Sequence, residues 1–316
     1  MMLKIMGAWM LLALLTLVGE WHGRCYGCLQ EERIGLLEIQ SLIDPDGFSL
    51  RDWVDSSNCC EWPGIKCDNT TRRVIQLSLR GARDFRLGDW VLNASLFQPF
   101  KELQSLDLGD TGLVGCMENE GFEVLSSKLR KLDLSGNRFN DKSILSCFDW
   151  AFHPRVFGSI SQWVDSWIRF QGPVIKVEKA GEPSLTGFSS LKSLDLSDNG
   201  LTAGSGGFND LSSRLKKLEN LDLGWNHCND SIFPSLTVFS SLKSLDLSGN
   251  QLTRSGFEII SSHLWKLESL DLSRNQLTGS ITSWCELKNL KQLDLSGNNL
   301  AGSLPDYLGN LSSLQL

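Results

Sequence analysis

The sequence predicts an α/β solenoid, in which short coils of similar sequence stack along one axis and each adds a strand to a parallel sheet. One leucine-rich phrase recurs along most of the chain, its copies are evenly spaced, and four cysteines gather near the N-terminus. A chain of 316 residues is long enough for one elongated domain or two compact ones. Its net charge of -7 argues against nucleic acid as a partner, because phosphate binding needs clustered lysine and arginine.

The recurring phrase is Leu-x-x-Leu-Asp-Leu-x-x-Asn-x-Leu, which is the pattern of a leucine-rich repeat. A degenerate copy begins at Val74, and the clear copies begin at Leu103, Leu129, Leu191, Leu218, Leu242, Leu267 and Leu290. Successive clear copies are 23 to 27 residues apart, except for one interval of 62. This spacing predicts a right-handed leucine-rich-repeat superhelix with its parallel sheet on the concave face.

In each copy, apolar and polar residues alternate, as they do in a strand that buries one face. In the copy that begins at Leu267, Leu270 and Leu272 point inward, whereas Ser269 and Asp271 point outward. A single strand of this kind cannot bury its apolar face. Neighbouring copies must therefore stack and share one core.

An asparagine follows each strand at the same offset, where the chain turns inward. A buried amide there would bond turn backbone groups of its own and adjacent repeats, so we expect a structural ladder and not a ligand site. Thr111 holds this place in the first clear copy and predicts a weaker rung. The ladder residues are Asn137, Asn199, Asn226, Asn250, Asn275 and Asn298.

An aspartate occupies one outward position of every clear copy: Asp107, Asp133, Asp195, Asp222, Asp246, Asp271 and Asp294. Neighbouring strands lie about 4.8 Å apart, and unit charges at that spacing repel by just under ~1 kcal/mol in water. Stacking exceeds this repulsion, so a uniform acidic column can persist. The column is either part of the repeat's scaffold or a surface for cationic partners. A glycosidase would need two carboxylates in different environments within a cleft.

The first residues predict an export signal over 1–27. Lys4 precedes an apolar run over 8–18, which is shorter than the roughly 20 residues that span a bilayer. Four Asn-x-Ser/Thr sequons for N-linked glycans fit this route: Asn69, Asn93, Asn229 and Asn310. No later stretch is apolar enough to cross a membrane. We expect the protein to be secreted or to lie on the extracellular face of the plasma membrane.

Four of the nine cysteines lie close together after the signal: Cys28, Cys59, Cys60 and Cys67. In an exported protein such a cluster predicts disulfides. Zinc is the competing interpretation, but adjacent cysteines are poor metal-ligand spacing and no histidine lies near them. Four cysteines allow three pairings. The state of the others stays open: Cys25, Cys116, Cys147, Cys228 and Cys285.

A cap over 28–73 precedes the repeats. The stretch 29–43 predicts an amphipathic helix that ends at Asp44-Pro45. Its apolar face holds Leu36, Ile39 and Ile43. Trp53 and the segment Cys59-Cys-Glu-Trp-Pro-Gly-Ile-Lys-Cys67 follow. A solenoid needs such a cap, because an open end exposes apolar core.

These cap residues, with Cys28-Leu-Gln-Glu-Glu-Arg33 and the Leu-Asp-Leu-Ser-x-Asn repeats, resemble plant extracellular leucine-rich-repeat proteins, and the whole looks like a plant receptor-like protein. The resemblance runs from about residue 28 to the end, except over one segment. It implies the pairs Cys28–Cys59 and Cys60–Cys67. It also implies a second short strand in each repeat, but several copies depart from that element, so we expect an incomplete second sheet.

The resemblance further implies more repeats, a C-terminal cap, one transmembrane helix and a short cytoplasmic tail. The sequence stops at 314–316, inside a repeat. We therefore expect a fragment or a truncated gene model, which would be attached to a membrane only through a missing C-terminal helix.

The segment 148–184 interrupts the repeats, which occupy 74–147 and 185–316. It contains no leucine and accounts for the long interval, because removing it restores an ordinary step. It is either a looped-out insertion that contributes to binding or translated intron, a gene-model artefact. We favour the second interpretation, because the repeat register resumes on both sides.

The predicted function is ligand recognition by the ectodomain of a plant receptor-like protein, in defence or developmental signalling. The ligand would be a peptide, a protein or a glycan. Signalling would need a co-receptor kinase, because no kinase motif occurs in the sequence. The alternative is a secreted inhibitor of microbial cell-wall hydrolases, similar to polygalacturonase-inhibiting proteins. A full-length transcript would separate the two by ending in a membrane span or in a closing cap.

Candidate contact residues are outward positions that depart from the small side chains of the repeat: Lys131, Trp225, Arg274 and Gln292. Trp225 is the strongest candidate, because exposed aromatic residues are enriched at binding hot spots. No pattern predicts catalysis, a cofactor or a metal. The histidines at 22, 153, 227 and 263 form no triad and no metal spacing.

Overall fold

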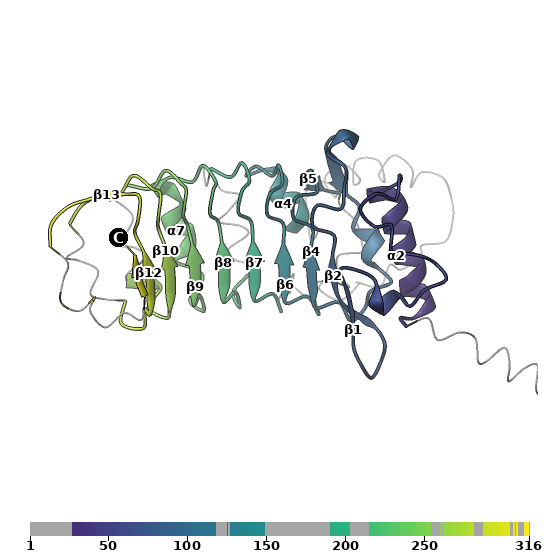
Figure 1. Cartoon of the computed structure of the whole chain (residues 1–316). Coiled ribbons are helices and arrows are strands. Elements are labelled where there is room, and N and C mark those ends of the chain that lie inside the picture. Colours follow the sequence, from purple (N-terminus) through teal and green to yellow (C-terminus); the bar gives the residue numbers. More distant parts are fainter. Residues whose placement is uncertain are drawn as a thin grey trace, which may run out of the picture.

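The computed structural model describes residues 27–117, 125, 127–148, 190–202, 215–253, 260, 262–280, 287–303, 306, 308 and 313–315. These residues form an elongated solenoid whose strands lie side by side along one face (Figure 1). The expected signal peptide, except residue 27, lies outside the described residues, and so does the segment 148–184, except Phe148. The sequon at Asn310 also lies outside them.

The main sheet has ten strands in the order β1-β2-β4-β6-β7-β8-β9-β10-β12-β14. β1 (Ile65–Cys67) is antiparallel to β2 (Val74–Ser78), and each later pair is parallel. The remaining strands are β4 (Ser105–Asp107), β6 (Lys131–Asp133), β7 (Ser193–Asp195), β8 (Asn220–Asp222), β9 (Ser244–Asp246), β10 (Ser269–Asp271), β12 (Gln292–Asp294) and β14 (Ser313–Gln315). The predicted parallel-sheet solenoid with a disulfide-bonded N-terminal cap is confirmed.

The parallel strands pair without a shift between repeats, so equivalent residues form straight rows. Leu270 of β10 lies beside Leu245 of β9 and Leu293 of β12, and all three are at most 2 % exposed. The register also continues across the irregular interval, because Leu132 of β6 lies directly beside Leu194 of β7. Shared leucine rows of this kind give the solenoid one continuous core.

A second set of short strands is incomplete, as expected. β3 (Trp90–Leu92) pairs with β5 (Leu113–Cys116), and β11 (Thr278–Gly279) pairs with β13 (Asn299–Leu300). The other short elements are the 3-10 helices η1 (Cys59–Glu61), η2 (Phe85–Leu87), η3 (Ala94–Phe97) and η4 (Asp230–Ile232), and the helices α4 (Ser143–Phe148) and α7 (Phe233–Leu236). Phe148, which the sequence assigns to the irregular segment, ends α4 and is buried.

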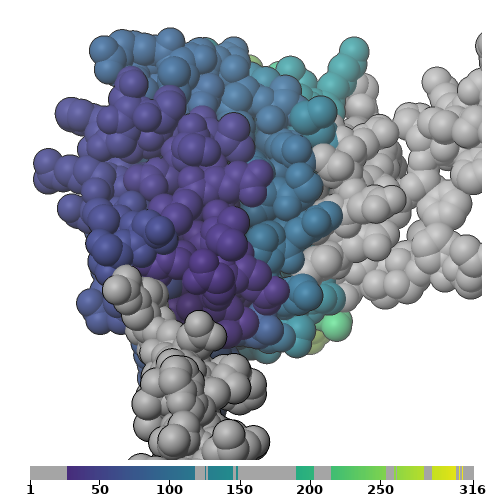
Figure 2. Space-filling view, turned by 90° about the vertical axis from the view of Figure 1, so that its right-hand side faces the viewer, coloured from purple at the N-terminus to yellow at the C-terminus, as the bar shows by residue number. Residues whose placement is uncertain are grey.

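Helix α2 (Gln30–Ile43) covers the N-terminal end of the solenoid, where the purple residues of the cap face the viewer (Figure 2). Its apolar face buries Leu36, Ile39 and Ile43, as the sequence predicts. The helix ends at Asp44, whose carboxylate accepts hydrogen bonds from the backbone N–H groups of residues 48–50. The apolar end of the repeat core is therefore shielded from water.

Two charged residues of α2 are buried as well, which the hydrophobic pattern does not predict. Glu32 accepts a 2.9 Å hydrogen bond from the backbone N–H of Val74, the first residue of β2, and burial raises the pKa of this carboxyl group. Arg33 lies 5.3 Å from the ring centre of Trp62 and donates to Asp55 at 2.9 Å. These contacts join the cap helix to the first strand and to the tryptophan-bearing loop.

Three disulfides are present in the described residues. Cys28–Cys59 and Cys60–Cys67 lie in the cap and are the pairs that the resemblance implies. The third, Cys116–Cys147, joins β5 to α4, so the structure assigns two cysteines whose state the sequence leaves open. Cys228 is a buried free thiol, and burial raises its pKa to about 12.

The asparagine ladder forms as predicted. In a representative rung, the Nδ2 group of Asn250 donates to the carbonyl of Leu247 in its own repeat (3.1 Å) and of Leu223 in the preceding one (2.9 Å). Its Oδ1 atom accepts from the backbone N–H of Cys228 at 2.9 Å. Thr111 makes a shorter rung, because its hydroxyl reaches only Leu108 and the side chain of the next asparagine.

Candidate binding surface

The outward side chains of the parallel strands form the candidate binding surface, which we call the sheet face. Its first row is the aspartate row, namely Asp107, Asp133, Asp195, Asp222, Asp246, Asp271 and Asp294. The turn row stands three residues after it, where the backbone adopts positive φ: Asp110, Gly136, Asp198, Trp225, Gly249, Arg274 and Gly297. Because the register is constant, both rows cross the strands in straight lines.

The aspartates have a structural role in every repeat. Each carboxylate accepts a hydrogen bond from the backbone N–H two residues later, at 2.8–3.1 Å. This bond closes the turn that ends the strand, which explains why the repeat uses aspartate there. The second carboxylate oxygen stays available for other contacts.

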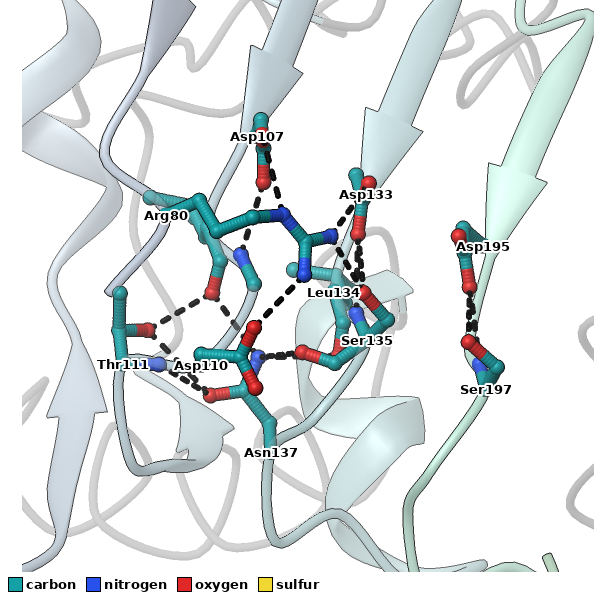
Figure 3. Close-up of polar contacts among 12 residues, drawn as sticks. Arg80, Asp107, Asp110, Thr111, Asp133, Leu134, Ser135, Asn137, Asp195 and Ser197 are labelled. Carbon is teal, nitrogen blue, oxygen red and sulfur yellow. Dashed lines mark hydrogen bonds and ion pairs between the residues drawn. The ribbon is translucent and has the colours of Figure 1, made fainter. Parts of the chain in front are cut away.

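At the N-terminal end of the sheet face, Arg80 uses those free oxygens (Figure 3). Its guanidinium donates to Asp110 and Asp133 at 2.7 Å each and lies 3.5 Å from Asp107. It also donates to the hydroxyl of Ser135 at 2.6 Å. Burial opposes its charge, but the three carboxylates raise the pKa of Arg80 above its usual value. One arginine from the preceding repeat thus pairs with aspartates of the next two repeats.

Gly109 makes this crossing possible. A Cβ atom at this position would come within 2.5 Å of the Arg80 guanidinium. Most later repeats carry serine here, as at Ser135 and Ser197, and one carries Gly224. The path of the Arg80 side chain therefore requires glycine at position 109.

Farther along, the aspartate row has a different environment. Burial, together with the nearby Asp246 and Asp195 carboxylates, raises the pKa of Asp222 to about 7. Burial likewise raises the pKa of Asp246. The aspartates of the row therefore differ in environment, because burial raises the pKa of Asp222 and Asp246 and because Arg80 reaches one end alone.

The structure brings Trp225 and Arg274 together. The guanidinium of Arg274 lies 5.7 Å from the ring centre of Trp225, although a repeat separates them. The indole passes over that repeat at Gly249, where a Cβ atom would come within 2.8 Å of the ring. Trp225 remains 56 % exposed. The pair forms a flat, cationic-aromatic platform over three repeats.

Both platform residues adopt a backbone conformation that favours glycine. Trp225 has φ 56° and Arg274 has φ 54°, where Gly136, Gly249 and Gly297 occupy the equivalent position of other repeats. A bulky residue with positive φ costs roughly 1–2 kcal/mol. A large exposed side chain held at such a position is typical of a functional surface.

Lys131 and Gln292 do not join this platform. Both are exposed at the first position of their strands, β6 and β12. Four strands, β7, β8, β9 and β10, lie between them. At about 4.8 Å per strand, they are some 24 Å apart, too far for one small site. Trp225 and Arg274 therefore lie together, whereas Lys131 and Gln292 cannot both belong to one small site.

A third row, directly before the strands, alternates in charge. Glu219 bonds Lys192 at 2.5 Å and Lys243 at 2.7 Å, and Glu268 bonds Lys291 at 2.6 Å. The two lysines lower the pKa of Glu219 to about 2. The sequence could have revealed this row, because these residues all follow the first leucine of a copy. Paired within the protein, they offer little free charge to a ligand.

Three sequons lie in the described residues. Asn69 and Asn229 are exposed, and Asn93 is partly exposed. Asn93 and Asn229 are the N-cap residues of the 3-10 helices η3 and η4. None of the three is in a strand of the main sheet, so glycans on them would begin outside the sheet face.

Within the described ranges, no group of three or more histidine, cysteine, aspartate or glutamate side chains is arranged to hold a metal ion. In the same residues no helix combines the length and apolar character needed to cross a bilayer. His227 and His263 are exposed, and the other two histidines lie outside the described residues.

Family models match this chain at both of its predicted parts. Residues 29–68 match the leucine rich repeat N-terminal domain. Leucine rich repeats match over 240–285 and 265–313, and a further repeat model matches 125–146 and 189–206.

Similar proteins come from plants. Cuscuta receptor 1 of Solanum lycopersicum is 35% identical over 72% of this chain and 20% of its own length. Receptor-like protein 13 of Arabidopsis thaliana is 33% identical over 77% of this chain and 23% of its own length. The chain is a leucine-rich-repeat protein of the plant receptor-like type. It spans about a fifth of the length of these relatives.

Solved structures agree on the fold of this leucine-rich-repeat chain. The ectodomain of the Arabidopsis receptor kinase HAESA, in complex with the peptide hormone IDA and the co-receptor SERK1, aligns with a TM-score of 0.54 at 24% identity. The alignment covers 90% of this chain and 45% of the HAESA chain. A second HAESA structure, with an N-terminally extended IDA peptide, aligns with a TM-score of 0.52.

Proposed function

We propose that the chain is a ligand-recognition part of a plant receptor-like protein, and that it binds through the sheet face. The main supporting observation is the platform of Trp225 and Arg274, which exposes an aromatic ring and a guanidinium together. Within the described residues Arg274 has no carboxylate partner, so its charge is available to a ligand. Aromatic and arginine side chains dominate binding hot spots.

The charge pattern suggests how a ligand lies on this face. Arg80 pairs with Asp107 and Asp133 of the row, whereas Asp222 and Asp246 have no cation beside them in the described structure. A ligand with a cationic group over these two carboxylates and a flat group on Trp225 would match both features. A peptide, a protein loop or a glycan supplies such groups, and we favour a peptide segment because it combines them within a few residues.

The relatives suggest the setting. We infer that the protein acts without catalysis, on the extracellular side of the plasma membrane or after secretion, and that a co-receptor kinase transmits the signal. The receptor names of the relatives support this inference. The solved HAESA complex, which holds a peptide hormone and a co-receptor, is an example of the same fold in this role.

A peptide-display selection on the purified, glycosylated chain tests the proposal. We expect selected peptides to be enriched in lysine or arginine and in aromatic residues. Trp225→Ala should weaken their binding at least about tenfold, as hot-spot truncations do. Trp265→Ala is a matched control, because Trp265 is 55 % exposed and also has a cation near its ring, Lys266 at 5.0 Å, but it lies in the turn before β10. Equal loss in both variants, or none in either, would contradict the proposal.

A further inference from the structure

A pocket of about 200 Å³ lies beside the sheet face, between the excursion 83–89 and the turns of the next two repeats. Its walls come from Arg83, Phe85, Asp89, Asp110 and Arg138, with glycines 88, 112 and 136 between them. Phe85 lines the pocket and is itself 87 % exposed. The volume suits one amino-acid residue or one sugar unit, and we call this the flank pocket.

Both carboxylates of the flank pocket already have a cation. Asp89 is paired with Arg138. Asp110 accepts a 2.7 Å hydrogen bond from Arg80, which also holds the aspartate row. Neither acid is therefore available to balance another charge.

Arg83 is the pocket arginine without a carboxylate partner in the described structure. Its terminal nitrogens donate over long distances to the carbonyls of Leu42 (3.3 Å), Leu87 (3.4 Å) and Gly88 (3.5 Å). Its Nε atom is buried without any hydrogen-bond acceptor. Burial lowers the pKa of this guanidinium, so its surroundings disfavour the charge.

The position of Arg83 is nevertheless fixed. Its guanidinium lies 5.3 Å from the ring centre of Trp90, the first residue of β3, and the indole nitrogen of Trp90 donates to the carbonyl of Thr111 at 2.8 Å. A partly buried cation that is held in place and lacks an acid destabilises the protein unless an anion approaches it. The pocket beside it has room for that anion.

We propose that the flank pocket binds a carboxylate group, with Arg83 as its counter-ion and Phe85 as an apolar wall for the remainder of the ligand. A carboxylate matches a guanidinium with two parallel hydrogen bonds, so it would satisfy donors that now make long contacts. The site is separate from the platform of Trp225 and Arg274, and it does not depend on the function proposed for that surface.

The test is calorimetric titration of the intact, disulfide-bonded chain with matched acid and neutral probes. N-acetyl-phenylalanine is compared with its amide, and glucuronate is compared with glucose. We expect the acid of at least one pair to bind at least about tenfold more tightly than its neutral counterpart, as one charge-assisted contact provides. A preference among the acids identifies the source, a peptide end or a uronic acid.

Variants locate the site. Arg83→Gln, which keeps hydrogen-bond donors but removes the charge, should abolish the preference for the acid. The double variant Arg138→Gln/Asp89→Asn removes the other ion pair of the pocket without changing its net charge, and it should retain the preference. The proposal is overturned if no acid binds, if acid and neutral probes bind equally, or if Arg83→Gln binds the acid as the unaltered protein does. The comparison of acid and neutral probes decides the outcome even if a variant fails to fold.

Discussion

The two ends of the sheet face are built on the same repeat but present different chemistry. Near the N-terminus, Arg80 crosses Gly109 and pairs with three carboxylates from the next two repeats. Near the other end, Trp225 crosses Gly249 to reach Arg274. Both contacts bridge three repeats by passing over a glycine. The guanidinium of Arg80 is paired with carboxylates of the protein itself, whereas the Trp225–Arg274 contact leaves an aromatic ring and a cation exposed.

The contrast shows that small departures from the repeat pattern change the chemistry of this surface. The backbone, the leucine rows and the asparagine ladder are the same on both sides. A few outward side chains then decide whether a region stabilises the solenoid or remains available to a partner. Predictions about the two ends should therefore separate the shared scaffold from these side chains.

The largest expected effect concerns the shared scaffold. Asn137→Ala and Asn250→Ala should each lower the free energy of unfolding by about 2–4 kcal/mol, because each leaves buried carbonyl and N–H groups without partners. The loss should be similar at both ends and is measured by urea denaturation. Asn289→Ala is the control, since this exposed side chain bonds one carbonyl, and it should change stability by less than about 0.5 kcal/mol. A loss at one end alone would show that the ladder is not shared.

A smaller effect separates the two arginines. Arg80→Met should lower stability by about 1–2 kcal/mol, because it leaves three neighbouring carboxylates without their cation. Arg274→Met should cost less than about 0.5 kcal/mol, since Arg274 is exposed and contacts Trp225. The difference should narrow at about 1 M salt, where charges are screened. If both variants lose the same stability in denaturation experiments, the contrast between the two ends fails.

The smallest effect is a pH dependence at Asp222. Its folded-state pKa is raised from 3.8 to about 7, so the folded protein binds the proton more tightly than the unfolded chain. Its contribution to stability is complete below about pH 4 and is lost as the pH rises through 7. Partial exposure limits this to about 1 kcal/mol. Asp222→Asn should flatten that part of the stability profile. Identical profiles for Asp222→Asn and the unaltered protein would refute this.

Much of the scaffold was predictable from the sequence. The spacing of the leucines predicted the parallel sheet, and the constant position of the asparagine after each strand predicted the hydrogen-bonded ladder. The apolar face of the cap helix predicted which of its residues are buried. Each of these depends on contacts that repeat at a fixed spacing, so one chain contains many copies of the same signal. The buried charges Glu32 and Arg33 were not predictable, because their partners lie in another segment.

The site was less predictable than the fold. Trp225 and Arg274 stand out as departures from the repeat, but their contact across Gly249 depends on side-chain direction. The Arg80 cluster was missed because Arg80 lies in the degenerate first copy, where the phrase does not mark it. The raised pKa of Asp222 arises mainly from desolvation. Because every clear copy has the same aspartate at this position, the sequence does not distinguish Asp222 from the others.

The most direct test of the account maps where a ligand attaches. A selected peptide that carries a photo-reactive group is bound to the purified chain, crosslinked and located by mass spectrometry. The account predicts attachment within the repeats of β8, β9 and β10, next to Trp225 and Arg274. Attachment confined to the repeats that Arg80 bridges, or to residues outside the sheet face, would contradict it.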